Sequence, residues 1–281
     1  MSTPSLDQTS PPGSISLMLG HLGCAILVLA FVNLYELYRL VSDLLGARFL
    51  ALAPLVLPPI FLVVIFVFAR RSARLVPLAL TPTLAGIALC VVALAIPDPE
   101  IAIKRIHVAQ YLLLSLAVRH TLASRLGGIE LTLSATLLSC LYGVHDEMLQ
   151  GLHPDRTYGL RDIMVNTLAS CGGGLIWHGL SLFEKGHAPI RSLTGWSWMH
   201  RLMLFGMSVA VVLMAVPLVA YRNHPLPPWP FLPLAALLIL WGLLFMYPRQ
   251  NGYHFSQPLG VITLLFLLYP FAVNVLQIPF Y

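Results

Sequence analysis

Nine apolar runs, each roughly 20 residues long, follow one another along this chain and constrain its fold more than any other feature. About 20 mostly apolar residues suffice for a helix to cross a bilayer, where only helices and closed barrels satisfy their backbone hydrogen bonds. The runs cover residues 15–38, 50–69, 76–96, 102–123, 129–148, 160–183, 201–221, 230–247 and 258–277. We therefore predict an all-α fold, a polytopic transmembrane helical bundle with about nine spanning helices.

The composition also favours a membrane protein. Hydrophobic residues make up 58% of the 281 residues and charged residues 10%, a balance that the surface of a soluble domain would not tolerate. The net charge of +5 comes from Lys and Arg scattered between apolar runs, which suits loops facing anionic lipid. We expect no nucleic-acid partner. The four cysteines lie within apolar runs without metal-like spacing, which is typical of small buried side chains.

The chain divides into four predicted regions. Residues 1–14 are polar and lack the basic start of a signal peptide, so we predict a disordered N-terminal tail. Transmembrane helices follow at 15–75, a four-helix core at 76–183, and further transmembrane helices at 184–281. Slightly more Lys and Arg fall on the side of the N-terminus than on the opposite side, which predicts a cytoplasmic N-terminus.

Charge is dense only between Tyr142 and Asn166. Alternation of the helices places the start of the fourth, the end of the fifth and the start of the sixth at one membrane surface. The stretches "KRIHVAQY", "HDEMLQ" and "RDIMVN" are therefore expected to meet there. Polar side chains at this depth are unfavourable unless they face protein or a watery cavity, so we predict one functional cleft.

Residues three or four apart share a helical face, and each stretch pairs an ionisable or strongly polar side chain with a hydrogen-bonding companion at that spacing. The predicted site residues are Lys104, His107, Tyr111, Glu147, Gln150, Arg156, Asp162 and Asn166. We place Glu147 at the centre of the site. Its neighbour Asp146 lies about 100° further around the helix and is expected to point elsewhere.

The expected mouth of the cleft is basic. Its basic residues are Lys104, Arg105, Arg156 and Arg161. Such a ring favours an anionic headgroup, either a lipid phosphate or a carboxylate. Two structural alternatives stay open: the basic residues bind ordinary phospholipid, and the polar pairs are interhelical hydrogen bonds or interfacial helix caps.

The stretch "ASCGGG", from Ala169 to Gly174, places small residues four positions apart within the sixth run. This spacing permits close approach between helices in a bilayer. The stretch has no Walker lysine, so we interpret these glycines as a packing surface and not as a phosphate loop.

The order of these motifs resembles the VanZ-like family of membrane proteins, named after a protein linked to teicoplanin resistance. The family pattern is Lys-x-x-His-x-x-x-Tyr, then Glu-x-x-Gln, an arginine in the turn, and Asp-x-x-x-Asn followed by small residues. The resemblance covers residues 76–183, with departures at Ile103, where the family often has an acid, and at Ala169, where a glycine is common. It implies a multi-pass protein of the bacterial cytoplasmic membrane that affects glycopeptide (teicoplanin) sensitivity.

The partners implied are membrane lipids and a lipid-linked envelope precursor or lipoglycopeptide, with membrane-protein partners contacting the flanking helices. We expect no cofactor and no metal, because the chain has no nucleophile motif and no multi-histidine cluster. A membrane-embedded enzyme is an alternative, with Glu147 and His107 as base and acid, or with Asp162 as a third metal ligand. A transporter or scaffold subunit is another, although clear internal repeats are missing. A non-enzymatic role is favoured.

Overall fold

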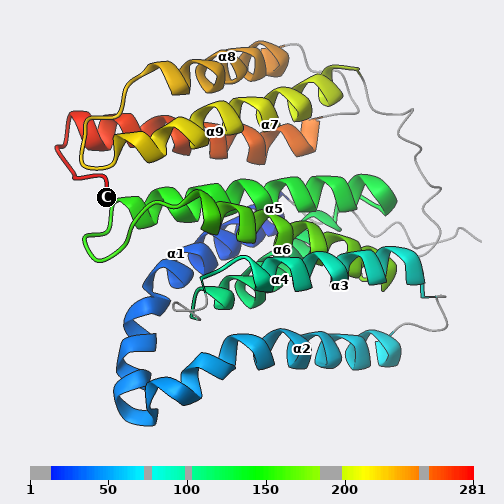
Figure 1. Ribbon diagram of the computed structural model, residues 1–281. Helices are drawn as coiled ribbons and strands as arrows, with labels where there is room; N and C mark the ends of the chain where they lie inside the picture. The colour runs from blue at the N-terminus through cyan, green and yellow to red at the C-terminus, as the bar shows by residue number, and fades with distance from the viewer. Residues whose placement is uncertain (1–13, 73–77, 99–102, 184–197, 247–252) are drawn as a thin grey trace, which may run out of the picture.

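The computed structural model describes residues 14–72, 78–98, 103–183, 198–246 and 253–281. Within these ranges the chain forms nine α-helices and no strand, so the predicted all-helical bundle is confirmed (Figure 1). The helices are α1 (Ser14–Leu45), α2 (Ala47–Ser72), α3 (Leu80–Ala95), α4 (Ile106–Leu122), α5 (Gly128–Gly151), α6 (Leu160–Gly179), α7 (Trp198–Leu218), α8 (Leu232–Met246) and α9 (Tyr253–Asn274).

The helix α6 lies at the centre of the packing and contacts α3, α4 and α5. Three consecutive glycines allow this. A Cβ atom on Gly172 would lie 2.6 Å from Cys90 Sγ on α3, whereas one on Gly173 would collide with Ser115 on α4. A Cβ atom on Gly174 would collide with Thr136 on α5. The predicted role of these glycines in close helix packing is therefore confirmed.

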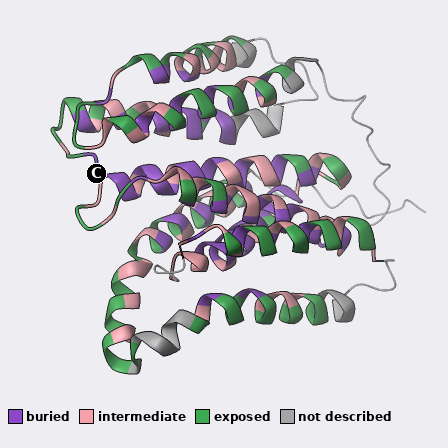
Figure 2. Ribbon diagram, viewed as in Figure 1, coloured by how far each residue is buried: buried purple, intermediate pink, exposed green. Residues whose placement is uncertain are grey.

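The other helices surround this centre in layers. In Figure 1, α7, α8 and α9 lie on one side of α3–α6 and α2 lies on the opposite side. The helix α1 contacts α2, α4 and α5, while α9 contacts α5. Figure 2 shows that buried residues concentrate in α5 and its neighbours, whereas much of the described surface of α2 is exposed. The buried core therefore encloses the helices that carry most of the predicted site.

Length and polarity separate the helices that could cross a membrane from the rest. Among the described residues, two helical stretches are long and apolar enough, Ile15–Leu44 and Leu202–Tyr221. The helices α3, α4 and α8 have 16, 17 and 15 residues, fewer than the roughly 20 of a spanning helix. The helices α5 and α6 are long enough but carry the polar cluster. Nine membrane spans therefore stay a prediction.

Helix boundaries differ from the predicted runs in both directions, and α3, α4 and α6 are shorter than the runs at 76–96, 102–123 and 160–183. The helix α1 continues to Leu45, beyond residue 38, and α5 continues through the charged stretch to Gly151. Pro54, Pro58 and Pro59 lie inside one 26-residue helix, α2. Of the predicted tail at 1–14, residues 1–13 lie outside the described part of the chain.

Candidate functional site: a polar cluster where α4, α5 and α6 meet

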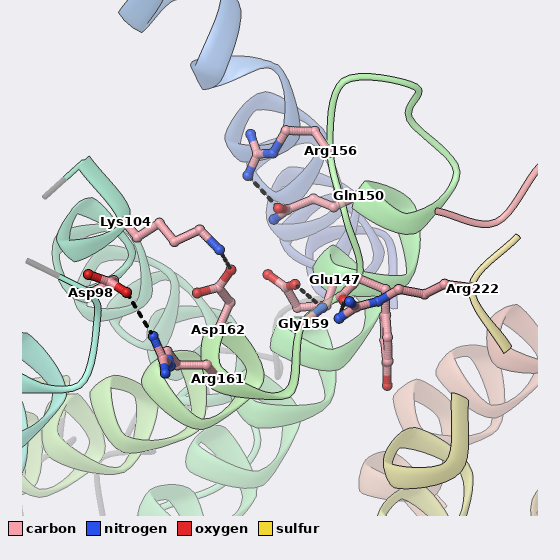
Figure 3. Close-up of polar contacts among 10 residues, drawn as sticks. Asp98, Lys104, Glu147, Gln150, Arg156, Gly159, Arg161, Asp162 and Arg222 are labelled. Carbon is pink, nitrogen blue, oxygen red and sulfur yellow. Dashed lines mark hydrogen bonds and ion pairs between the residues drawn. The ribbon is translucent and has the colours of Figure 1, made fainter. Parts of the chain in front are cut away.

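Residues of the three polar stretches, among them Lys104, Glu147 and Asp162, lie close together (Figure 3). Lys104, just before α4, donates from Nζ to Asp162 Oδ2 in the first turn of α6, at 2.5 Å. The backbone N–H of Gly159, just before α6, donates to Glu147 Oε2 on α5 at 3.2 Å. The alternating direction of successive helices explains this meeting, because α4 and α6 begin at the end where α5 finishes.

The centre of this cluster consists of His107, Glu147 and Asp162, which come from three different helices. Each residue offers one nitrogen or oxygen atom, and these three atoms lie within 4.8 Å of one another. The exposed fractions are 4%, 0% and 1%, respectively, so bulk water does not surround them. The cluster places an imidazole and two carboxylates together, which is the chemical equipment for proton transfer or for binding a cation.

Asp146 also belongs to the cluster, and the prediction that it points elsewhere is wrong. It is fully buried, and its Oδ2 accepts a hydrogen bond from the Tyr111 hydroxyl at 3.0 Å. The helix α5 contacts α1, α4, α6 and α9, so two residues about 100° apart on it can both face other helices. The position of Asp146 beside Glu147 in the one charge-dense stretch was the signal that could have revealed it.

Gln150 and Arg156 connect the cluster to its mouth. Arg156 Nη2 donates to Gln150 Oε1, and its guanidinium lies 5.2 Å from the centre of the Tyr35 ring on α1. Gln150 is buried, whereas Arg156 is partly exposed. The contact with Tyr35 is a cation–π interaction, which orients the arginine while leaving other N–H groups available.

Asn166 lies one turn into α6 from Asp162 and is buried. Its Nδ2 donates to the carbonyl oxygen of Gly143 on α5 at 3.4 Å. A Cβ atom on Gly143 would lie 2.9 Å from the Cβ atom of Asn166 and 3.2 Å from the Tyr111 ring. The close contact of α5 and α6 at Gly143 therefore holds this part of the cluster together.

The remaining basic residues of the predicted mouth have different surroundings. Arg161 is 57% exposed at its side chain and lies 3.7 Å from Asp98, which follows α3 (Figure 3). Arg105 Nε instead donates to the carbonyl oxygen of Leu94 at 3.0 Å. Lys104 and Arg161 thus remain partly accessible at the mouth, while Arg105 binds the backbone of α3.

The turn between α5 and α6 is held by the last third of the chain, a role that sequence reasoning missed. The backbone N–H of Tyr158 donates to the Tyr281 carbonyl at 3.0 Å, and the Tyr281 N–H donates to the Gly151 carbonyl at 2.7 Å. Arg222 donates to the Tyr158 carbonyl, and the Phe280 ring packs against the Tyr158 ring. Burial raises the pKa of the Tyr158 phenol, which donates to the Ala215 carbonyl at 2.6 Å.

No protein-family model, curated protein or solved structure matches this chain. The fold and the site themselves define the class of protein: the described residues form an all-helical bundle with a buried polar cluster at one end. The resemblance to the VanZ-like family stays a prediction that rests on the ordered motifs.

Proposed function

We propose that this chain is a multi-pass protein of the bacterial cytoplasmic membrane that binds an anionic, lipid-like envelope ligand at the mouth of the α4–α6 cluster. One observation carries this proposal: three partly accessible cations lie beside the buried polar cluster. They are Lys104, Arg156 and Arg161. A phosphate or carboxylate approaching from the membrane surface meets these cations first.

Exposed apolar side chains support embedding in a bilayer. On α2, Leu52, Val63 and Phe68 are 60%, 61% and 59% exposed, and further apolar residues are exposed on α1, α3, α7 and α9. Monomeric soluble proteins rarely expose apolar patches larger than a few hundred Å². Contact with lipid tails instead of water would remove the unfavourable free energy of exposing these apolar side chains. The shorter helices fit the same proposal, because 16 residues span about 24 Å and a modest thinning of the bilayer accommodates the difference.

Arg156 is the best placed of the three cations to recognise a phosphate. Its contact with Gln150 uses one of the five N–H donors of a guanidinium, and the remainder can bind two oxygen atoms at once. Tyr35 limits the orientations of the side chain, so less conformational entropy is lost on binding. Lys104 and Arg161 add charge without the same orientation.

The resemblance to the VanZ-like family extends the proposal to a phenotype. The motifs that carry the resemblance, from Lys104 to Asn166, supply the residues of the cluster and its mouth. We propose that occupation of this mouth alters the sensitivity of the envelope to teicoplanin, a glycopeptide that itself carries a lipid tail.

Binding of defined lipids by the purified protein tests this proposal. The full chain in detergent is titrated with phosphatidylglycerol, with zwitterionic phosphatidylcholine, and with teicoplanin in separate experiments. We expect phosphatidylglycerol to bind more tightly than phosphatidylcholine, and Arg156→Gln to weaken that binding about tenfold, as for loss of one charged hydrogen bond. Tighter binding of teicoplanin than of phosphatidylglycerol identifies the glycopeptide as the ligand.

The matched control is Arg39→Gln. The Arg39 side chain is 58% exposed on α1 and its ion pair, with Glu36 at 3.8 Å, lies on the same helix. We expect this variant to bind phosphatidylglycerol as the unmodified chain does. Equal loss in Arg39→Gln and Arg156→Gln would show that the lipid responds to overall charge, and the proposed mouth would then be wrong.

A membrane-embedded enzyme is the second candidate, favoured by the short distances between the His107 imidazole and the Glu147 and Asp162 carboxylates. An imidazole beside a buried carboxylate can act as an acid–base pair on a ligand held at the mouth. Release of a soluble headgroup from a labelled lipid by the unmodified chain, and not by Glu147→Gln, would favour this candidate over simple binding.

A further inference from the structure

We propose that His107, Glu147 and Asp162 bind one divalent transition-metal ion at the base of the cluster. The three residues come from α4, α5 and α6, and each offers a ligand atom within 4.8 Å of the other two. One imidazole with two carboxylates suits ions such as Zn²⁺ and Mn²⁺. The metal site goes beyond the proposed lipid ligand and does not rest on it.

The hydrogen bonding of the three residues supports a ligand at this point. Within the described part of the chain, His107 Nδ1, Glu147 Oε1 and Asp162 Oδ1 are buried without a hydrogen-bond partner. A buried polar atom left without a partner costs about 1–3 kcal/mol. If the cluster served only to join helices, its members would be expected to satisfy one another. All three residues of the group therefore carry an unpartnered buried atom, which is better explained by a cation that accepts their lone pairs.

The negative charge of the buried carboxylates also supports a bound cation. The cluster holds two carboxylates, and the Lys104 ammonium, 2.5 Å from Asp162 Oδ2, offsets one of them. Asp146 adds a third carboxylate to the same end of α5, with Arg156 further out at the mouth. Buried carboxylates require cations or protons for compensation. A divalent ion would supply this compensation and release Lys104 from Asp162.

The distances between the three ligand atoms limit the movement that binding of a metal ion requires. Metal bonds to imidazole and carboxylate are about 2.1 Å long, so two ligand atoms of one ion lie at most about 4.2 Å apart. The three ligand atoms lie within 4.8 Å of one another, so any inward movement that binding requires is no more than some tenths of an ångström. Rotation of the Glu147 or Asp162 carboxylate provides such a movement. Positions not filled by protein would accept water or an oxygen atom of an anionic ligand.

Cobalt titration of the purified full chain tests this inference, because Co²⁺ replaces Zn²⁺ and absorbs visible light when bound by nitrogen and oxygen ligands. After removal of metals with a chelator, we expect saturation at one Co²⁺ per chain, and displacement of Co²⁺ by Zn²⁺. His107→Gln and Glu147→Gln should each reduce the affinity at least a hundredfold. The matched control is Asp155→Asn, an exposed acid in the neighbouring turn, which should bind Co²⁺ normally.

Lys104→Met keeps the inference testable even if loss of a ligand impairs folding. It removes the ammonium that competes for Asp162, so we expect it to bind Co²⁺ about tenfold more tightly, as for removal of one charged hydrogen bond. Absence of Co²⁺ binding at millimolar concentration in both the unmodified chain and Lys104→Met would overturn the inference. Normal Co²⁺ binding by a correctly folded Glu147→Gln variant would overturn it too. Arg156→Gln removes a positive charge and no metal ligand, so it should not weaken Co²⁺ binding, whereas it should weaken lipid binding; this difference separates the two results.

Discussion

Asp146 and Glu147 are neighbours in the chain but contact different elements. Asp146 accepts a hydrogen bond from Tyr111 on α4, whereas Glu147 accepts one from the Gly159 backbone before α6. Spacing along one helix predicted that Glu147 faces the other polar stretches. It could not predict the place of Asp146, because the faces of a helix that are buried depend on how many neighbours surround it.

The contact between Tyr111 and Asp146 yields a prediction for stability. Tyr111→Phe removes the hydroxyl and leaves Asp146 Oδ2 buried without its donor, so we expect a loss of about 1–3 kcal/mol in the free energy of unfolding. Unfolding in detergent, followed by circular dichroism with increasing denaturant, measures this loss.

The control is a double-mutant cycle with Asp146→Leu. Replacement of both hydrogen-bonding partners by apolar groups removes the unsatisfied carboxylate, so the double variant should be more stable than the sum of the single losses implies, by about 1 kcal/mol or more. Additive losses would mean that the hydroxyl and the carboxylate do not stabilise each other.

At the scale of helices, the sequence predicted which segments are helical because each apolar run stands between polar turns. The run at 160–183 corresponds to α6, Leu160–Gly179, and its glycines were correctly assigned to packing. Which helices these glycines contact was not predictable. Successive residues lie about 100° apart around the axis, so Gly172, Gly173 and Gly174 face α3, α4 and α5 in turn.

Because Gly172 packs closely against α3, we predict that Gly172→Ala lowers the free energy of unfolding of the bundle. Its Cβ atom would lie 2.6 Å from Cys90 Sγ and 2.7 Å from the Gly86 carbonyl oxygen, and the backbone oxygen cannot move without shifting α3. Overpacking of this kind costs about 1–3 kcal/mol. We expect a lower melting temperature of the purified protein in detergent.

Gly23→Ala on α1 provides the comparison, since its Cβ atom would meet no other atom within 4 Å. Alanine has the higher helix propensity, so this variant should melt at the same temperature or slightly above. A similar melting temperature for Gly172→Ala and Gly23→Ala would show that α3 and α6 are less closely packed than described.

At the scale of the whole molecule, α5 connects two ends of the bundle. The polar cluster lies at the end of α5 near Gly151, and the short turn before Gly128 lies at the opposite end. The helix α5 has 24 residues, a length of about 36 Å, which exceeds the thickness of the hydrocarbon core. Alternation of apolar runs predicted that the polar stretches meet at one end. It could not predict that residues after 220 hold the adjoining turn, because those contacts join segments far apart in sequence.

Cysteine labelling tests the orientation that we propose for this end in a membrane. We predict that Thr157→Cys, in the exposed turn after α5, reacts in intact cells with a maleimide that cannot cross the membrane. Gly127→Cys, exposed before α5, should react only after permeabilisation. The unmodified chain, whose free cysteines lie within helices, gives the background. The reverse pattern would place the N-terminus outside the cytoplasm.

The contact of Phe280 and Tyr281 with the turn between α5 and α6 has a consequence for biosynthesis. The polar residues from Lys104 to Asn166 leave the ribosome well before residues 280 and 281, by on the order of ten seconds at ordinary rates of translation. During that interval α4, α5 and α6 can already associate, but Tyr158 and Gly151 still lack their partners. The mouth of the cluster therefore reaches its final form only after α9 and the residues up to Tyr281 have been synthesised.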